Sequence, residues 1–337
     1  MSDRADQRDG FLDRSGWGTA RRAFLAGDAS DRSYDRLWRG TESAVLMDAP
    51  PGKGDDPARF IAIAQHLGQL GLSPPRILAR DLNQGFLLIE DLGDGLFARI
   101  IAAHPHREYD LILAATDVLV TLQAHPAPSG LDDPTAADWA KAASFALEFY
   151  AAAITGVQPD PTGFLNHLTT SLHTHADGPR VMIVRDFHAE NLLDLPERQG
   201  VARVGLLDFQ QAQMGQPGYD LVSLVQDARH DVSPVVAQAA IAHFAQQTGR
   251  DPAALQTSLA VLGAQRALRI LGIFARLCTV GGKPGYLALI PRVWGRLQEN
   301  LAHPALGGLG QVCTTHLPPP TPDHLQRIAA RCAALSP

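Results

Sequence analysis

The stretch between Val181 and Asp220 constrains the fold of this chain more than any other part. It contains two short apolar runs, V-M-I-V and V-G-L-L, and an aspartate follows each of them, Asp186 after the first and Asp208 after the second. Short apolar runs bounded by polar residues predict buried strands. We therefore expect Asp186 and Asp208 in loops at strand ends, where a carboxylate can face a cleft.

The polar residues of this stretch match the needs of phosphoryl transfer from ATP. Such a reaction requires a group that orients the attacking hydroxyl, and oxygen ligands that hold Mg²⁺ on the nucleotide phosphates. Asp186 fits the first role, Asn191 and Asp208 fit the second, and Asp220 opens an apolar helix. Taken singly, each of these residues is explained equally well as a residue that caps a turn. The complete series favours a phosphotransferase site.

Length and composition are those of a soluble globular protein. The chain has 337 residues, of which 45% are hydrophobic and 19% charged, with a formal net charge of −6 and a pI of about 6.1. This length favours about two domains or lobes. No long basic run is present, so nucleic acid is not expected as the main partner.

The sequence gives no indication of secretion, membrane insertion or a disulfide framework. The N-terminus is charged and lacks the apolar core of a signal peptide, and Arg269 and Arg276 interrupt the most apolar stretch. The cysteines, Cys278, Cys313 and Cys332, are odd in number and widely spaced. We therefore expect a cytoplasmic protein that does not bind a membrane, with a monomer as the default state.

Hydrophobic periodicity divides the chain into a strand-rich first part, residues 1–92, and a helical second part, residues 93–337. The expected strands are 23–26, 37–39, 43–47, 77–79, 86–89, 181–184 and 204–207. The expected helices are 11–17, 57–70, 110–123, 136–152, 161–175, 219–227, 234–248, 252–277, 286–301 and 323–335. The pattern predicts an α+β class with a domain boundary at residue 92.

A Gly-led turn, G-D-A-S-D-R-S, separates the first two expected strands. Backbone N–H groups in such a turn can close over phosphate, although a plain hairpin turn is the alternative. Upstream of a phosphoryl-transfer constellation the phosphate-covering loop is favoured. Its candidate nucleotide-binding residues are Gly27, Ser30, Arg32 and Ser33.

Several motifs together resemble one enzyme superfamily. D-x-x-x-x-N, L-L-D-F and G-x-P-x-Y-D-L are similar to the aminoglycoside phosphotransferase and choline kinase branch of the protein-kinase-like fold. G-D-A-S-D-R-S-Y-D-R-L, G-F-L-L-I-E-D-L-G-D and R-D-F-H-A-E-N-L-L more closely resemble bacterial anomeric amino-sugar kinases. Those kinases phosphorylate the C1 hydroxyl of N-acetylmuramate and N-acetylglucosamine in cell-wall recycling. The resemblance spans roughly residues 24–304.

This resemblance implies a bilobal α+β fold, with a small β-rich N-lobe and a larger helical C-lobe. It implies ATP as co-substrate and Mg²⁺ as cofactor, with Asp186 as catalytic base and Asn191 and Asp208 as metal ligands. Asp220 would brace the catalytic loop. The backbone from Glu90 to Leu92 would meet the adenine.

The chain departs from the family pattern at three places. Val184 stands where a histidine usually precedes the catalytic aspartate, and Gln210 replaces the glycine after D-F. The third strand reads V-L-M-D and lacks the lysine that normally binds the α and β phosphates. Phosphate charge still needs a cation, and Arg32, Arg36 and Lys53 are the candidates. Arg32 is the first choice because it lies in the covering loop; a solvated turn residue is the alternative.

Residues of the second part are candidates for binding the acceptor. His188 and Gln210 lie close to the catalytic positions in sequence, and Glu148 lies among aromatic residues that could form a platform for a sugar. Arg266 and Arg269 share a helical stripe with Arg276 and could meet an acidic group on the substrate. The alternatives are a satisfied loop histidine, inward packing of the aromatic residues and a solvated charged helix face.

Three functions remain open at this point. The first is an ATP- and magnesium-dependent kinase of N-acetylmuramate or N-acetylglucosamine, without a ranking of the two sugars or of ATP over GTP. The second is a kinase of another small alcohol, such as another sugar, an aminoglycoside or a choline-like amine. A polycationic acceptor calls for a dense acidic patch, which the sequence lacks. The third is a catalytically silent kinase-like nucleotide-binding protein.

Overall fold

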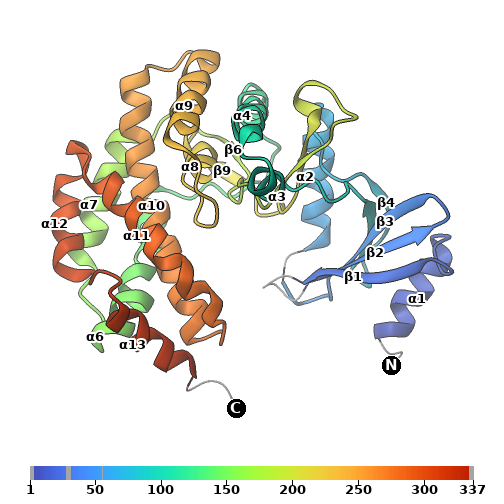
Figure 1. Cartoon of the computed structure of the whole chain (residues 1–337), viewed down its shortest axis with the longest axis horizontal. Helices are drawn as coiled ribbons and strands as arrows, with labels where there is room; N and C mark the ends of the chain where they lie inside the picture. Colours follow the sequence, from blue (N-terminus) through green and yellow to red (C-terminus); the bar gives the residue numbers. More distant parts are fainter. Residues whose placement is uncertain (1–3, 28–31, 55, 334–337) are drawn as a thin grey trace. The chain divides into compact units, whose positions relative to one another are not determined.

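The computed structural model describes residues 4–27, 32–54 and 56–333, and its contacts divide the chain into two compact units. Unit 1 comprises Met1–Pro128 and Ala189–Ala212, and unit 2 comprises Ser129–His188 and Gln213–Pro337. Unit 1 contains an antiparallel sheet, and the remainder is mostly helical (Figure 1). The expected α+β class is confirmed, whereas the boundary expected at residue 92 stays a prediction.

Unit 1 is built on a five-stranded antiparallel sheet of order β1-β2-β3-β5-β4. The strands are β1 (Arg21–Gly27), β2 (Ser33–Arg39), β3 (Glu42–Asp48), β4 (Ile77–Asp81) and β5 (Phe86–Glu90). All five strands expected in this part are present, each longer than its apolar run by polar residues at its ends. β1 forms one edge of the sheet, and all of its residues are exposed.

One face of this sheet is covered by α1 (Arg4–Arg14). Phe11 and Leu12 of the helix form a core cluster with Leu46 and Phe86 of the central strands, and the rings of Phe11 and Phe86 stack with centroids 5.6 Å apart. The helix begins before the expected residue 11. Its first turns are charged, so apolar periodicity marks only its end.

The opposite face of the sheet meets α2 (Pro57–Gln69) and carries the site described below. Successive side chains of a strand point to opposite faces, so Val45 and Ile89 point away from α1. The start of α2 follows its sequence signals, because the Asp56 carboxylate accepts a hydrogen bond of 2.8 Å from the N–H of Ala58 and Pro57 occupies the first turn.

The rest of unit 1 contains α3 (Phe97–Ala103), α4 (Glu108–Gln123), the short 3-10 helices Pro105–Arg107 and Gly200–Arg203, and a hairpin of β7 (Leu192–Asp194) and β8 (Val204–Leu206). The hairpin is anchored to unit 1 by two backbone bonds, from Ala98 N–H to the carbonyl of Ala189 (3.0 Å) and from Leu206 N–H to that of Ser73 (2.9 Å). These bonds place Asn191 and Asp208 beside the sheet rather than among the later helices.

Unit 2 is organised around the long helix α10 (Pro252–Thr279), which contacts most of its other helices. Among the described residues α10 alone is long and apolar enough to cross a membrane, but 78% of its most apolar window is buried inside the protein, as in a core helix. The other elements are α5 (Ala136–Ala143), a π-helical segment (Ala146–Ala151), α6 (Ala152–Thr155), α7 (Thr162–His175), β6 (Val181–Ile183), β9 (Gln213–Gly215), α8 (Tyr219–Val225), α9 (Pro234–Thr248), a 3-10 helix (Pro284–Leu289), α11 (Ile290–Leu301), a 3-10 turn (Pro304–Leu306), α12 (Gly307–His316) and α13 (Pro322–Ala333).

Several expectations for the helical part are wrong in detail. The helix expected at 136–152 is interrupted around Phe145, where the backbone of α10 passes so closely that a Cβ on Gly272 would lie 2.2 Å from the carbonyl carbon of Phe145. α3 and α12 were not expected, because the first is short and the second is rich in glycine. The two apolar runs that precede Asp186 and Asp208 do not pair with each other; each pairs antiparallel with a three-residue strand, the first with β9 and the second with β7.

Candidate active site

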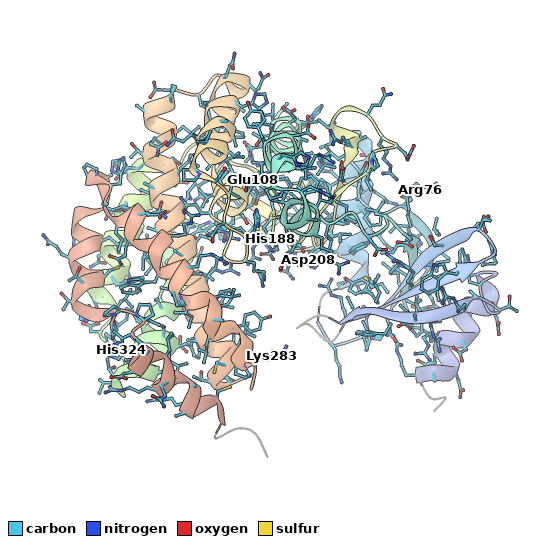
Figure 2. All side chains as sticks on the ribbon, in the orientation of Figure 1. Arg76, Glu108, His188, Asp208, Lys283 and His324 are labelled. Atoms are coloured by element: carbon cyan, nitrogen blue, oxygen red, sulfur yellow. The ribbon has the colours of Figure 1, made fainter. Side chains whose placement is uncertain are left out.

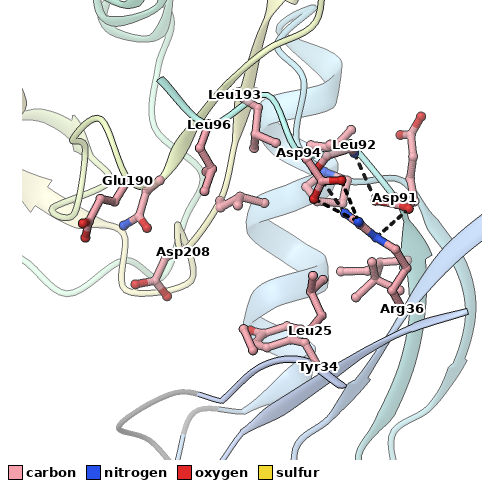
Figure 3. A pocket seen from close by; sticks show the side chains of 18 of the residues that line it. Leu25, Tyr34, Arg36, Asp91, Leu92, Asp94, Leu96, Glu190, Leu193 and Asp208 are labelled. Atoms are coloured by element: carbon pink, nitrogen blue, oxygen red, sulfur yellow. Dashed lines mark hydrogen bonds and ion pairs between the residues drawn. The ribbon is translucent and has the colours of Figure 1, made fainter. Parts of the chain in front are cut away.

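Unit 1 contains a cavity of about 380 Å³ on the face of the sheet opposite α1 (Figure 3). Val45 and Ile89 of the sheet and Phe60 of α2 provide apolar walls, and Phe60 packs against Phe209 with ring centroids 4.8 Å apart. Polar lining comes from the segment after β5 and from the ends of the β7–β8 hairpin. The polar and charged residues at its edge are Tyr34, Arg36, Glu90, Asp91, Asp94, Arg99, Glu190, Asn191 and Asp208.

Asp208 is held in a strained backbone conformation at this cavity. Its φ of 54° lies in the left-handed region, which non-glycine residues rarely adopt. Its Oδ1 accepts hydrogen bonds from Nε2 of Gln210 (2.6 Å) and from the guanidinium of Arg32 (3.3 Å). The side chain is still 36% exposed. The neighbouring N–H of Leu207 binds the carbonyl of Asn191 at 2.9 Å, which keeps both metal-ligand candidates at one cavity.

This donor set suits a hard cation. Asp208 supplies a carboxylate and Asn191 an amide oxygen, and Mg²⁺ is held in such sites by one or two carboxylate or carbonyl oxygens together with substrate phosphates and water. The residues that the structure describes include no group of three or more His, Cys, Asp or Glu side chains that could hold a metal by themselves. The pair therefore fits a metal that arrives with a nucleotide better than a fully protein-bound one.

The three cations considered for phosphate binding differ sharply in their environments. Arg32 is buried, with 4% of its surface exposed, and pairs with Asp208, so the alternative of a solvated turn residue is wrong. Arg36 is committed to the segment after β5, with bonds of 2.9 Å to Asp91 and Asp94 (Figure 3). Lys53 is exposed. Arg32 therefore remains the first candidate.

The other nucleotide-binding candidates of unit 1 lie around the same cavity, except Ser30, which lies outside the described residues. Gly27, Glu90 and Leu92 line the cavity, and Ser33 begins β2 opposite Gly27. The Glu90 carboxylate is bound by Arg76 at 3.2 Å and by Arg198 at 2.8 Å. These ion pairs hold the segment that the resemblance assigns to adenine.

Asp186 belongs to unit 2, in the loop that follows β6 (residues 184–188, called the β6 loop). Asp220 of α8 is fully buried and accepts two backbone hydrogen bonds from this loop, from the N–H of Val184 (2.7 Å) and of Arg185 (2.9 Å). Arg185 has a φ of 72°, again in the left-handed region. Burial raises the pKa of Asp220 to about 7, although its two N–H donors oppose the shift. Asp220 of α8 thus holds the conformation of the β6 loop.

His188 is a buried residue at the end of the β6 loop, with 6% of its surface exposed (Figure 2). Burial lowers the pKa of its imidazole; the charge of Asp227 opposes this effect, and the positive charges of Arg266 and Arg229 add to it. The neutral ring is therefore the favoured form near neutral pH, and it can both donate and accept hydrogen bonds. Its contact with a substrate stays a prediction.

The arginine stripe expected on α10 does not form one solvated face. Arg266 is only 6% exposed and donates a 2.6 Å hydrogen bond to the hydroxyl of Ser223. Arg269 is half-buried, and its charge helps burial to lower the pKa of Arg185. Arg276 is exposed and lies over the ring of Phe149, 5.6 Å from its centroid. A direct substrate contact therefore fits Arg269 better than Arg266.

Two further acceptor candidates have unexpected surroundings. Gln210 is 1% exposed and its amide binds Asp208, which does not fit a direct contact with a sugar. Glu148 is exposed within the π-helical segment. The aromatic platform expected near it is not formed by Trp139 and Tyr150, because both are buried. Inward packing, the alternative reading, is the correct one for these two rings.

Ser223 and the clamp of Arg36 on Asp91 and Asp94 were missed from the sequence. Ser223 lies three residues after Asp220, on the same side of α8, and this spacing is the signal that could have found it. The Arg36 clamp gives no signal in the sequence, because its partners follow β5 and are far from Arg36 along the chain.

Comparison with known proteins gives consistent similarities over nearly the whole chain. Residues 22–256 match the model of the phosphotransferase enzyme family. The chain is 37% identical to the N-acetylmuramate/N-acetylglucosamine kinase of Caulobacter vibrioides, over 91% of this chain and 95% of that protein. It is 31% identical to the kinase of the same name from Pseudomonas aeruginosa, over 88% and 90%.

Solved structures share the fold at low sequence identity. A putative aminoglycoside phosphotransferase from Ralstonia eutropha superposes with a TM-score of 0.63 at 14% identity, over 91% of this chain and 98% of that one. A choline/ethanolamine kinase family protein from Mesorhizobium loti superposes with a TM-score of 0.59 at 14% identity, over 97% and 100%. The fold implied by the sequence motifs is therefore confirmed.

Proposed function

The chain belongs to the phosphotransferase enzyme family and is a small-molecule kinase with a sugar hydroxyl as acceptor; from this premise we propose that, with Mg²⁺, it transfers the γ-phosphoryl group of ATP to the C1 hydroxyl of N-acetylmuramate or N-acetylglucosamine. The observation that supports this acceptor most directly is the similarity, over 91% of the chain, to a kinase named for both sugars.

The cavity of unit 1 is proposed as the nucleotide site. Its apolar walls, Val45, Ile89 and Phe60, suit a flat base, and the backbone from Glu90 to Leu92 offers N–H and C=O groups at its edge. Asn191 and Asp208 would hold Mg²⁺. When bound with the nucleotide, this ion supplies positive charge that neutralises the phosphates.

Arg32 and Gln210 are proposed to orient the Asp208 carboxylate. Both donate to the same carboxylate oxygen, which fixes the direction of the carboxylate before the nucleotide arrives. Arg32 also places a guanidinium next to the proposed metal ligand, at a cavity where the sheet has no lysine. We assign to Arg32 the phosphate contact that a lysine of the third strand usually makes.

Asp186 is proposed as the catalytic base. Its carboxylate accepts a hydrogen bond from the C1 hydroxyl and takes the proton as the new oxygen–phosphorus bond forms and the bond to the β-phosphate oxygen breaks. The proton stays on the Asp186 carboxyl and is released to solvent after the products leave, and ADP keeps the electron pair of the broken bond. Positioning and electrostatics therefore supply most of the catalysis.

Polar groups of unit 2 are proposed to bind the sugar. His188 can hydrogen-bond a sugar hydroxyl as a neutral ring, and Glu148 presents an exposed carboxylate. Arg269 and Arg185 concentrate positive charge, since the pKa of Arg185 is lowered by burial and by the charge of Arg269. An anionic group such as the lactyl carboxylate of N-acetylmuramate would relieve this repulsion. Arg266 is not assigned this role because its guanidinium donates to the hydroxyl of Ser223 at 2.6 Å.

The proposal is tested by a transfer assay over a panel of acceptors. Purified protein is incubated with Mg²⁺-ATP and, in parallel, Mg²⁺-GTP, and with N-acetylmuramate, N-acetylglucosamine, glucose, kanamycin or choline. We expect transfer to the two N-acetylated sugars and loss of it in Asp186→Ala. Asp177→Ala, in the same unit, is the matched control because Asp177 is exposed and pairs with Arg180 and His173 on the surface.

The panel also separates the alternative functions. Transfer to kanamycin, choline or glucose in preference to both amino sugars would identify a kinase of another small alcohol. Binding of ATP without transfer to any acceptor would identify a catalytically silent protein. In either case the proposed acceptor is wrong.

A further inference from the structure

The β6 loop needs an anchor that its sequence does not reveal. Val184 occupies the position where relatives of this fold usually carry a histidine, and an aliphatic side chain cannot hydrogen-bond the loop. Arg185 adopts a left-handed backbone with a φ of 72°. A non-glycine residue pays on the order of 1–3 kcal/mol for such a conformation, and it persists only where its surroundings hold it.

The backbone of Arg185 is held at both ends by α8. Its N–H donates to Oδ1 of Asp220 at 2.9 Å, and its carbonyl accepts a hydrogen bond from the hydroxyl of Ser223 at 3.3 Å. Asp220 and Ser223 are three residues apart, so they lie on the same side of the helix. Ser223 therefore holds the carbonyl of the peptide unit between Arg185 and Asp186.

The direction of the Ser223 hydroxyl is itself determined. Arg266 donates to its Oγ at 2.6 Å, and a guanidinium is a donor only. Oγ must therefore accept from Arg266, and its single proton is left to point at the carbonyl of Arg185. Ser223 is fully buried and Arg266 is 6% exposed, so water does not compete with the bond between them.

We propose that Ser223 and Arg266 are positioning residues for the catalytic base, forming a relay from α10 through α8 to the carbonyl of Arg185 and so fixing the direction in which Asp186 leaves the β6 loop. Neither side chain touches the substrate. This role deepens the proposed function and rests on Asp186 being the base.

The relay predicts a specific kinetic signature. Loss of the Ser223 hydroxyl removes the hydrogen bond to the carbonyl of the Arg185–Asp186 peptide, while the N–H of Asp186 still donates to the carbonyl of Val184 at 2.9 Å. The loosened peptide can tilt and misplace the carboxylate without altering the groups that bind the nucleotide. A misplacement of about 1 Å costs about a hundredfold in rate. We therefore expect Ser223→Ala to lower kcat by about tenfold to a hundredfold. The KM values for ATP and for N-acetylglucosamine, which lacks the carboxylate proposed to meet Arg185, should stay within about twofold of wild type.

Matched variants separate positioning from general destabilisation. Ser171→Ala removes another buried serine hydroxyl of unit 2, on α7, and should leave kcat unchanged. Ser223→Thr keeps the hydroxyl and should restore most of the activity. Arg266→Lys retains the charge but offers a different donor geometry, and should reproduce the fall in kcat. If Ser223→Ala does not fold, this lysine variant decides the question.

Hydrogen exchange tests the relay without relying on catalysis. In the full-length protein we expect the amides of residues 184–186 to exchange faster in Ser223→Ala than in wild type and in Ser171→Ala, with the rest of unit 2 unchanged. A kcat within about twofold of wild type together with unchanged exchange in this peptide would overturn the relay. Absence of sugar phosphorylation by the wild-type protein would instead overturn the proposed function, and the exchange result would still stand.

Discussion

Replacement of Asp220 should reveal how much stability the β6 loop draws from one buried carboxyl group. Each of its two oxygens accepts a backbone N–H, from Val184 at 2.7 Å and from Arg185 at 2.9 Å. Asparagine retains one acceptor and turns an amide donor toward the other N–H, whereas alanine retains none. A buried donor left unsatisfied costs about 1–3 kcal/mol. We therefore expect Asp220→Asn to lose about 1–3 kcal/mol and Asp220→Ala about 2–6 kcal/mol of unfolding free energy.

Urea unfolding followed by circular dichroism measures this series, with the difference in free energy taken from the shift of the midpoint. Asp251→Ala is the control, because Asp251 caps α10 in the same unit through one exposed bond of 2.7 Å to Ala254. Loss of such a cap costs about 1 kcal/mol. If both Asp220 variants unfold at the midpoint of this control, the carboxyl group does not hold the β6 loop in the way described.

Three further predictions concern the two units separately. Arg32→Met should weaken ATP binding by about tenfold, as the loss of a charged hydrogen bond implies, with Arg32→Lys intermediate; calorimetric affinities equal to wild type would refute the phosphate contact. Arg269→Leu should raise the KM for N-acetylmuramate more than that for N-acetylglucosamine, and an equal rise for both sugars would contradict a carboxylate contact. Because the folded pKa of Asp220 is about 7 and that of the unfolded chain about 4, the proton-linked part of its contribution to stability is complete below pH 4 and is lost as the pH rises through 7. The difference in stability between wild type and Asp220→Ala should therefore narrow between about pH 4 and pH 8, and a constant difference would refute the raised pKa.

The sequence predicts the elements of this protein that follow strong periodicity. The five strands of the sheet, α4, α9 and α10 were all located, because each has a clear apolar pattern and standard end signals. β6 and β8 were located because each lies in a four-residue apolar run, whereas β7 (Leu-Leu-Asp) and β9 (Gln-Met-Gly) were not, since neither lies in such a run. The interruption near Phe145 depends on the close approach of α10, which is a tertiary effect.

The candidate site, too, is predictable from the sequence only where its residues are close together along the chain. Short-range spacing was enough to select Asp186, Asn191 and Asp208 as candidates and to associate Asp220 with them. The burial of Arg32 and Arg266 depends on residues far away in the sequence, and a charged side chain gives no sign in the sequence that it will be buried. The partner of each arginine is therefore determined by tertiary contacts, which the sequence pattern does not reveal.

The position of the transferred phosphate tests the central proposal most directly. N-acetylglucosamine and N-acetylmuramate labelled with carbon-13 at C1 are incubated with Mg²⁺-ATP and the protein, and the C1 resonance is followed by NMR. The proposal predicts coupling of C1 to phosphorus and loss of the reducing end, both absent with Asp186→Ala. A phosphorylated product that stays reducing, with no phosphorus coupling at C1, would contradict it.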